Sequence, residues 1–234
     1  MQNSEINELQ IFLGAGILNS GCGLYLPRFY GNVALAADTG EHPPLQYGGG
    51  TYSERDAKAA FYITSVLGHV LDLDKIQLEE ASDFTPDAGL AHKTAFLFGS
   101  RSNQVTIWAT EKLPESGFFK FNFGDRWEIK CKDGTVYSIL DPSKLEQGAY
   151  KNQTDYGVIS RMKVPETGER LFVIAGLGSR ATEGCGHYFS HHWRELFQRF
   201  GNNDFAVILK FSPPLDPEKY EPVAWFGDTA DLGS

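Results

Sequence analysis

Two segments of this 234-residue chain follow the same order: an apolar run, a loop of small residues that contains Gly-Ser-Arg, and the start of a helical pattern. In the first segment the apolar run 94–98 precedes the loop 99–103, and in the second the run 171–175 precedes the loop 176–182. A buried strand, a glycine-containing turn and a helix form the repeating unit of α/β folds. The repeated order therefore predicts that both loops lie at the carboxyl edge of one sheet.

Such an edge favours anionic ligands, because the free N–H groups and the dipole at a helix N-terminus attract phosphate or carboxylate. Neither loop has the Gly-Lys-Ser/Thr of a P-loop, and neither has the third spaced glycine of a dinucleotide-binding loop. The chain also lacks a complete catalytic signature. The pattern indicates a nucleotide-like ligand without identifying it.

The rest of the chain supports the same fold class. Apolar residues recur at helical spacing after Ser53, which is placed to cap a helix, and a long amphipathic pattern ends at Gly201. The expected helices are 54–71, 104–111 and 185–200, and the expected strands are 9–13, 76–78, 94–98, 155–161, 171–175 and 205–211. The segments 118–123, 127–131 and 135–140, with a turn at 132–135, predict antiparallel strands.

These elements predict an α/β fold, namely a three-layer sandwich with a mixed, mainly parallel sheet and an antiparallel hairpin insertion. The length fits a single α/β domain over 1–234. Within it, 1–50 is expected to be a loop-rich N-terminal segment and 213–234 a surface tail.

The net charge of −9 argues against duplex nucleic acid and anionic membranes as partners, since both require a basic face. A local basic pocket is still compatible with one small anion. No apolar run approaches the roughly 18 residues of a membrane span, and the N-terminus has no signal-peptide pattern. Three scattered cysteines favour a reducing compartment. We expect a cytoplasmic protein with no membrane partner.

The two loops supply most of the candidate ligand-binding residues. Their glycines allow close backbone approach, their hydroxyls can donate hydrogen bonds, and Arg180 can hold a phosphate through two hydrogen bonds. The amide of Asn103 can cap the next helix or contact a base or ribose. In the alternative interpretation Gly178 only permits the turn and Thr182 only caps the helix. The candidates are Gly99, Ser100, Arg101, Ser102, Asn103, Gly176, Gly178, Ser179, Arg180 and Thr182.

Asp155 and Tyr156 complete the candidate set. They precede an expected strand that contains Arg161, and an acid, a phenol and a guanidinium beside glycine-lined loops can recognise a ribose or a base. The alternative is an ordinary turn followed by an alternating strand.

A metal site is the weaker interpretation of the histidines in the last helix. His187 and His191 are four residues apart, which suits zinc or nickel, but no third ligand is specified and no glutamate lies between them as in HExxH. Cys185 points elsewhere on the helix. We expect no metal and no cofactor.

Four segments carry a resemblance to known proteins: Tyr52 with 56–60, then 96–103, 155–159 and 173–179. Together they resemble, over about 52–211, a loosely defined group of uncharacterised bacterial α/β domains, some of them joined to signalling or defence modules. In that group a proline stands where this chain has Arg101, and the second loop is shorter. The resemblance implies an α/β fold and a sensor-like role, with no reaction attached.

The first hypothesis is a regulatory or sensor domain that binds a nucleotide-like or other small anionic metabolite and controls an effector protein. The second is an enzyme that hydrolyses or transfers at an N-glycosidic bond of NAD or a nucleoside, in which Asp155 would be the catalytic carboxylate. The third is a protein–protein interaction module, because 13% of the residues are aromatic. The sequence leaves the ligand, the effector and the oligomeric state open.

Overall fold

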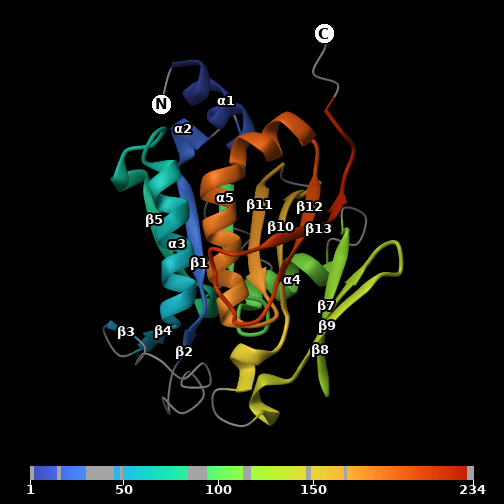
Figure 1. Ribbon diagram of the computed structural model, residues 1–234. Coiled ribbons are helices and arrows are strands. Elements are labelled where there is room, and N and C mark those ends of the chain that lie inside the picture. The colour runs from blue at the N-terminus through green and yellow to red at the C-terminus, as the bar shows by residue number, and fades with distance from the viewer. Residues whose placement is uncertain are drawn as a thin grey trace.

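A seven-stranded sheet forms the centre of the protein in the computed structural model, which describes residues 3–14, 17–29, 45–47, 50–83, 94–112, 117–145, 149–165 and 168–230 (Figure 1). The strand order is β13-β12-β10-β11-β6-β1-β5. The strands are β1 (Cys22–Leu26), β5 (Ile76–Glu80), β6 (Thr94–Phe98), β10 (Asp155–Lys163), β11 (Arg170–Gly176), β12 (Phe205–Phe211) and β13 (Glu221–Phe226).

The sheet is mixed. The strands β5, β1, β6 and β11 pair in parallel, whereas β10 is antiparallel to both of its neighbours, and β13 is antiparallel to β12. The chain goes from β1 outward to β5 and then returns to the other side of β1 to form β6. This reversal makes a topological switch point between β1 and β6, and ligands of open α/β sheets bind at the carboxyl ends of the strands at such points.

Five α-helices are described: α1 (Asn3–Leu13), α2 (Ile17–Ser20), α3 (Glu54–Leu67), α4 (Gln104–Lys112) and α5 (Ser179–Phe200). Helices α3 and α5 pack side by side, and a methyl group on Gly186 would lie 2.7 Å from Cα of Ala59, so the two backbones approach closely. Helix α5 lies on β10 and β11, where Phe189 packs edge-on against Phe96 and Phe172. Buried aromatic rings thus fill the space between α5 and the sheet.

Two smaller sheets complete the described fold. The antiparallel strands β7 (Phe119–Phe123), β8 (Arg126–Cys131) and β9 (Val136–Leu140) form one of them, which packs against α4 and β10. The strands β2 (Arg28–Phe29), β3 (Leu45–Tyr47) and β4 (Gly50–Tyr52) form the other. Four 3-10 turns are also described: Leu73–Lys75, Ala81–Asp83, Pro142–Lys144 and Ala149–Asn152. None of the described helices combines the length and apolarity needed to cross a membrane.

Several predicted elements are confirmed. Helix α3 begins after Ser53, whose Oγ accepts a hydrogen bond from the N–H of Asp56 at 3.4 Å. The turn at 132–135 joins β8 to β9, with Gly134 at a φ of 89° that glycine tolerates. Helix α5 ends at Gly201 as expected but begins at Ser179, because the loop 176–182 turns into helix earlier than the apolar pattern indicates.

One prediction about the terminal segments is wrong, and two segments expected to be loops or tail contain regular structure. Residues 9–13 belong to helix α1, whose buried Leu9, Phe12 and Leu13 have helical spacing. The segment 1–50 contains β1, a strand buried along its whole length, which the glycine at position 23 concealed. The expected tail includes the edge strand β13.

Candidate functional site

The two Gly-Ser-Arg loops meet at the carboxyl edge of β6 and β11, as predicted. The N–H of Gly99 donates to the carbonyl of Ile174 at 3.1 Å, and Oγ of Ser100 donates to the carbonyl of Gly176 at 2.7 Å. The contact follows from the topology, because β6 and β11 are parallel neighbours whose ends coincide. The hydroxyl of Ser100 is therefore used inside the protein and is buried.

Asn103 bridges β1 and β6 at the switch point. Its Nδ2 donates to the carbonyls of Tyr25 in β1 and Phe98 in β6, at 2.9 and 2.8 Å. Its Oδ1 accepts from the N–H groups of Val105 and Thr106, which caps α4. Because these bonds use every hydrogen-bonding direction of a fully buried amide, Asn103 positions the edge and is not free to contact a base or ribose.

The N-terminus of α5 already holds an anion, the carboxylate of Asp155. This carboxylate accepts hydrogen bonds from the N–H groups of Tyr156 and Gly178, at 2.7 and 3.2 Å, from the N–H of Ala181 and from the hydroxyl of Tyr150. Burial raises the pKa of Asp155 to about 6, although these four hydrogen bonds act to lower it. A side chain on Gly178 would overlap the Tyr150 hydroxyl, so glycine is required there. The predicted anion cradle is thus occupied by the protein's own carboxylate.

The other polar residues of the second loop also face inward. Oγ1 of Thr182 accepts from the N–H of Gly176 at 2.9 Å, which ties the start of α5 to the end of β11. Oγ of Ser179 is buried and has no hydrogen-bond partner among the described residues. Arg180 is buried, and its Nη1 donates to the carbonyl of Leu215 at 3.1 Å. Arg180 is therefore used inside the protein and does not face a surface ligand, because the segment after β12 lies against it.

Arg180→Ala is expected to lower the free energy of unfolding by about 1–3 kcal/mol, because the variant leaves a buried carbonyl unpaired and removes a buried side chain. Urea unfolding monitored by fluorescence measures the change. Arg126→Ala is the matched control: this exposed arginine contacts only Ser138 among the described residues, and its loss is expected to change stability by less than about 1 kcal/mol. Equal effects of the two substitutions would contradict a structural role for Arg180.

The residues of the candidate set that reach the surface are few. Arg101 and Ser102 are exposed, and the Arg101 guanidinium lies 5.1 Å from the centre of the Trp127 ring in β8. Tyr156 is half-buried, with its ring 5.2 Å from that of Tyr137 in β9. The strands β8 and β9 therefore supply aromatic side chains beside both loops, which the sequence analysis did not anticipate.

Asp56, in the first turn of α3, is the acidic group at this edge that sequence analysis missed. Its side chain is only 5% exposed, and a methyl group on Gly99 would lie 3.4 Å from its Oδ2, so the carboxylate lies directly over Gly99. Gly99 has a φ of 80°, which a residue with a side chain rarely adopts. Among the described residues no side chain or N–H donates to the Asp56 carboxylate, and burial raises its pKa to about 7.

Charged groups on α3 and α5 flank Asp56. Arg55 forms a buried ion pair with Glu183 of α5, and Lys58 bridges Glu54 at 2.8 Å and Glu183 at 3.9 Å. These pairs hold the two helices together beside the switch point, so the position of Asp56 is well defined.

Arg161 does not belong to the candidate site. It follows Asp155 by six residues on β10 and pairs with Phe205, at the start of β12, and with Phe172, near the start of β11. Its guanidinium is 1% exposed and contacts the carboxyl ends of α1 and α5 (Figure 1, upper end). The prediction that Arg161 helps to recognise a ribose is wrong, because β10 carries it to the opposite edge of the sheet.

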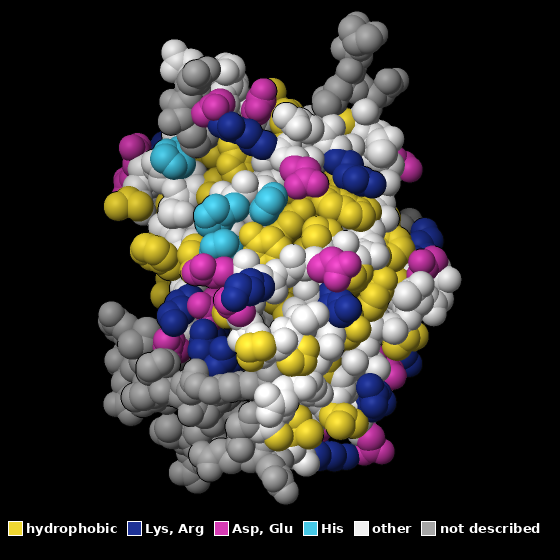
Figure 2. Space-filling model, viewed as in Figure 1, with side chains coloured by type: hydrophobic (Ala, Val, Ile, Leu, Met, Phe, Trp, Pro, Cys, Tyr) yellow, Lys and Arg dark blue, Asp and Glu magenta, His cyan; other side chains and the backbone are white. Residues whose placement is uncertain are grey.

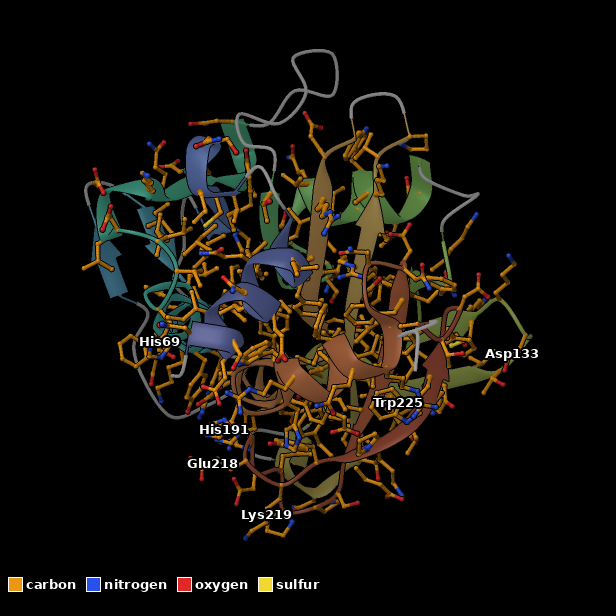
Figure 3. The ribbon with its side chains drawn as sticks, turned by 90° about the horizontal axis from the view of Figure 1, so that it is seen from above. His69, Asp133, His191, Glu218, Lys219 and Trp225 are labelled. Atoms are coloured by element: carbon orange, nitrogen blue, oxygen red, sulfur yellow. The ribbon has the colours of Figure 1, made fainter. Side chains whose placement is uncertain are left out.

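The histidines of α5 form a stacked surface cluster (Figure 2). The rings of His187 and His191 lie 4.1 Å apart and nearly parallel, with Nδ1 of His187 beside the Tyr220 hydroxyl and Nδ1 of His191 beside the carbonyl of His187. Parallel rings direct their lone pairs alongside each other rather than toward one ion. Figure 3 shows His191 on the same side of the molecule as Glu218. The described residues contain no group of three or more metal ligands, and whether the histidines bind metal stays a prediction.

No family model matches the chain, and no curated protein or solved structure is significantly similar to it. The candidate site rests on three features of the structure. The Asp56 carboxylate lies over Gly99 at the switch point, the polar groups of the second loop are hydrogen-bonded within the protein, and the Arg101 guanidinium lies against Trp127.

Proposed function

We propose that this protein is a ligand-binding regulatory or sensor domain for a nucleotide-like or other small anionic metabolite, bound at the switch point between β1 and β6. The observation that carries the proposal is Asp56, a carboxylate that is 5% exposed and has no donor among the described residues. Buried carboxylates with raised pKa values are concentrated at functional sites.

The energetics of Asp56 support a functional role over a structural one. A carboxylate in the first turn of a helix gains about 0.3–1 kcal/mol from the helix dipole. The rise of its pKa from 3.8 to about 7 corresponds to a burial penalty of about 4 kcal/mol for the charged form. Because the penalty is larger than the gain, ionised Asp56 destabilises the fold at neutral pH. Groups that lower stability in this way are found where activity requires them, which supports a functional role for Asp56.

Asp56 also indicates the part of the ligand that it would contact. An ionised carboxylate only accepts hydrogen bonds, and it pairs well with the two hydroxyls of a ribose. The carboxylate contacts the loop 99–103 at Gly99, so a ligand that reaches Asp56 also lies beside this loop. A ribose at Asp56 would leave the rest of a nucleotide to lie along the loop 99–103.

The test is a ligand screen by thermal shift followed by calorimetric titration. The panel contains the common nucleosides, their 5′-monophosphates and NAD. We expect at least one compound to raise the melting temperature, because a ligand that binds only the native state stabilises it by RT ln(1 + [L]/Kd). Asp56→Asn is expected to weaken binding about tenfold or more, the loss of a charge-assisted hydrogen bond.

Glu54→Gln is the matched control, since Glu54 lies in the same turn of α3 but pairs with Lys58. It is expected to bind the same compound normally. A panel in which nothing binds, or binding that Asp56→Asn leaves unchanged, would contradict the proposed site.

A second candidate function is hydrolysis or transfer at the N-glycosidic bond of NAD or a nucleoside, and the raised pKa of Asp56 favours it. A carboxyl group with a pKa near 7 is suited to proton transfer at neutral pH. Asp155 is not suited to this role, because it is fully buried and already accepts four hydrogen bonds. Release of free base from NAD or a nucleoside, abolished in Asp56→Asn, would establish an enzyme; binding without release would establish a sensor.

The proposal also includes a signalling context, an effector protein, a cytoplasmic location and a three-layer arrangement. The signalling context comes from the resemblance to bacterial α/β domains, and the effector would be a partner protein. A cytoplasmic location is supported by three free, buried cysteines, and a three-layer arrangement by the packing of α3 and α5 on the sheet and of α4 on β6.

A further inference from the structure

Arg101 is an exposed arginine whose polar atoms are uncommitted in the described part of the chain. Its guanidinium carbon lies 5.1 Å from the centre of the Trp127 ring, and no described residue forms a hydrogen bond or ion pair with it. The contrast is with Arg55, which is paired with Glu183, and with Arg180, which donates to Leu215. Arg101 therefore has donors available at the surface of the first loop.

The contact with Trp127 holds Arg101 without using those donors. A cation–π interaction engages the flat face of the guanidinium, whereas its N–H groups point outward in the plane. Trp127 is itself held in β8, and its ring meets that of Phe123 edge-on at 5.7 Å. The guanidinium is thus held beside Trp127, and its N–H groups remain available to pair with two oxygens of a phosphate.

Arg101 is on the loop that the carboxylate of the proposed site contacts. Gly99 lies under Asp56, and Arg101 is two residues further along the same loop, a separation of at most about 7 Å between the Cα atoms of Gly99 and Arg101. The loop therefore runs from its contact with a hydrogen-bond acceptor on α3 to an exposed cation. A ribose hydroxyl suits the acceptor, and a phosphate suits the cation.

We propose that Arg101, positioned by Trp127, recognises the phosphate of the ligand, so that the site prefers nucleoside 5′-phosphates to the corresponding nucleosides. This inference rests on the proposed function, since it assumes that Asp56 and Gly99 hold the sugar. Arg101 contacts the ligand, and Trp127 is a positioning residue that acts through Arg101.

Calorimetric titrations test the preference with named probes: adenosine, guanosine, cytidine, uridine, their four 5′-monophosphates, and inorganic phosphate. We expect one monophosphate to bind about ten- to a hundredfold more tightly than its nucleoside, the gain expected of charge-assisted hydrogen bonds. In Arg101→Gln this ratio is expected to fall close to one, while the nucleoside still binds. Inorganic phosphate alone is expected to bind far more weakly than the monophosphate.

Two further variants separate positioning from general structural damage. Trp127→Leu is expected to lose most of the phosphate preference, and Trp127→Phe to retain it, because phenylalanine also offers an aromatic face. Arg199→Gln is the matched control: its guanidinium lies 4.4 Å from the centre of the Trp225 ring, far along the chain near the end of α5. It is expected to leave the ratio unchanged.

Each outcome bears on a different proposal. A nucleoside and its monophosphate that bind equally well to the wild-type protein, or a ratio that Arg101→Gln does not change, would overturn the role of Arg101 and leave the site at Asp56 standing. Inorganic phosphate that binds as tightly as the monophosphate would overturn the preference for nucleotides. Absence of all binding to the wild-type protein would overturn both proposals.

Discussion

Replacing Arg161 with leucine is expected to lower the free energy of unfolding by about 3–5 kcal/mol, since this residue is a buried cation that the fold surrounds with carbonyl oxygens. Its guanidinium donates to the carbonyls of Phe12 at 3.0 Å and Gly201 at 2.8 Å, and also to that of Asn203. Removing the side chain takes this donor from the carbonyls of Gly201 and Asn203, while that of Phe12 keeps a hydrogen bond from Arg170 at 3.3 Å. For a chain of this length the expected fall in melting temperature is about 6–20 °C.

The large effect has a second cause in the helix ends. Phe12 lies in the last turn of α1 and Gly201 caps α5, so the carbonyls are at the negative ends of two helix dipoles. The rings of Phe12 and Phe205 lie on the guanidinium, 4.8 and 5.3 Å from its central carbon. Burial lowers the pKa of Arg161 to about 9, which still leaves it charged at neutral pH. Arg161 thus joins α1 and α5 to the sheet.

Urea unfolding measures the predicted change, and native-state hydrogen exchange should show the earliest loss of protection in α1. Arg199→Leu serves as the control, because Arg199 also lies on an aromatic ring but is exposed. Its loss is expected to change stability by about 1 kcal/mol or less. An Arg161→Leu variant as stable as this control would contradict the assignment.

Asp56→Asn is expected to stabilise the protein at pH 8 by about 2–4 kcal/mol while it weakens ligand binding. In the folded protein the pKa of Asp56 is about 7, against 3.8 for an unperturbed aspartate. Between these values the native state holds a proton that the unfolded chain releases, so stability falls as pH rises from about 4 to about 7. Asparagine is neutral at every pH, so the Asp56→Asn variant does not lose this stability as the pH rises.

The pH dependence distinguishes the effect of Asp56 from a general change in packing. The stability gain of Asp56→Asn should be full above about pH 7 and should shrink as the pH falls toward 4, where wild-type Asp56 is itself protonated. Unfolding curves of both proteins at pH 5 and pH 8 measure this difference. Glu54→Gln provides the comparison within the same helical turn. A variant destabilised at both pH values would show that Asp56 is a structural group.

Much of the architecture around the site was accessible to sequence analysis, because it depends on local chemistry. The cap at Ser53, the turn at 132–135 and the end of α5 at Gly201 each follow from residues adjacent in the chain. Helix α1 was missed because its apolar residues at 9, 12 and 13 were considered only within the run 9–13, where helix and strand cannot be distinguished by periodicity.

The site was predicted in part. The meeting of the two loops follows from their shared strand–loop–helix order, and hydrogen bonds between them confirm it. Asp56 was detectable in principle: with Ala60, Ile63 and Leu67 it recurs at helical spacing on the buried face of α3, and an acid on an apolar face is unusual. The cap at Ser53 accounts for the start of this helix without reference to the Asp56 side chain, so the residue did not stand out as a candidate.

By itself, the sequence determined the strands β6, β10, β11 and β12, the turn at 132–135, the start of α3 and the end of α5, and it predicted that a helix N-terminus would attract an anion. Only the tertiary structure decided which anion that is. Asp155 reaches Gly178 across 23 positions in the chain, and Tyr150 closes the other side of the carboxylate. Trp127 likewise reaches Arg101 from a separate sheet. Periodicity shows which face of an element is buried, whereas the partner on that face depends on how distant segments pack together.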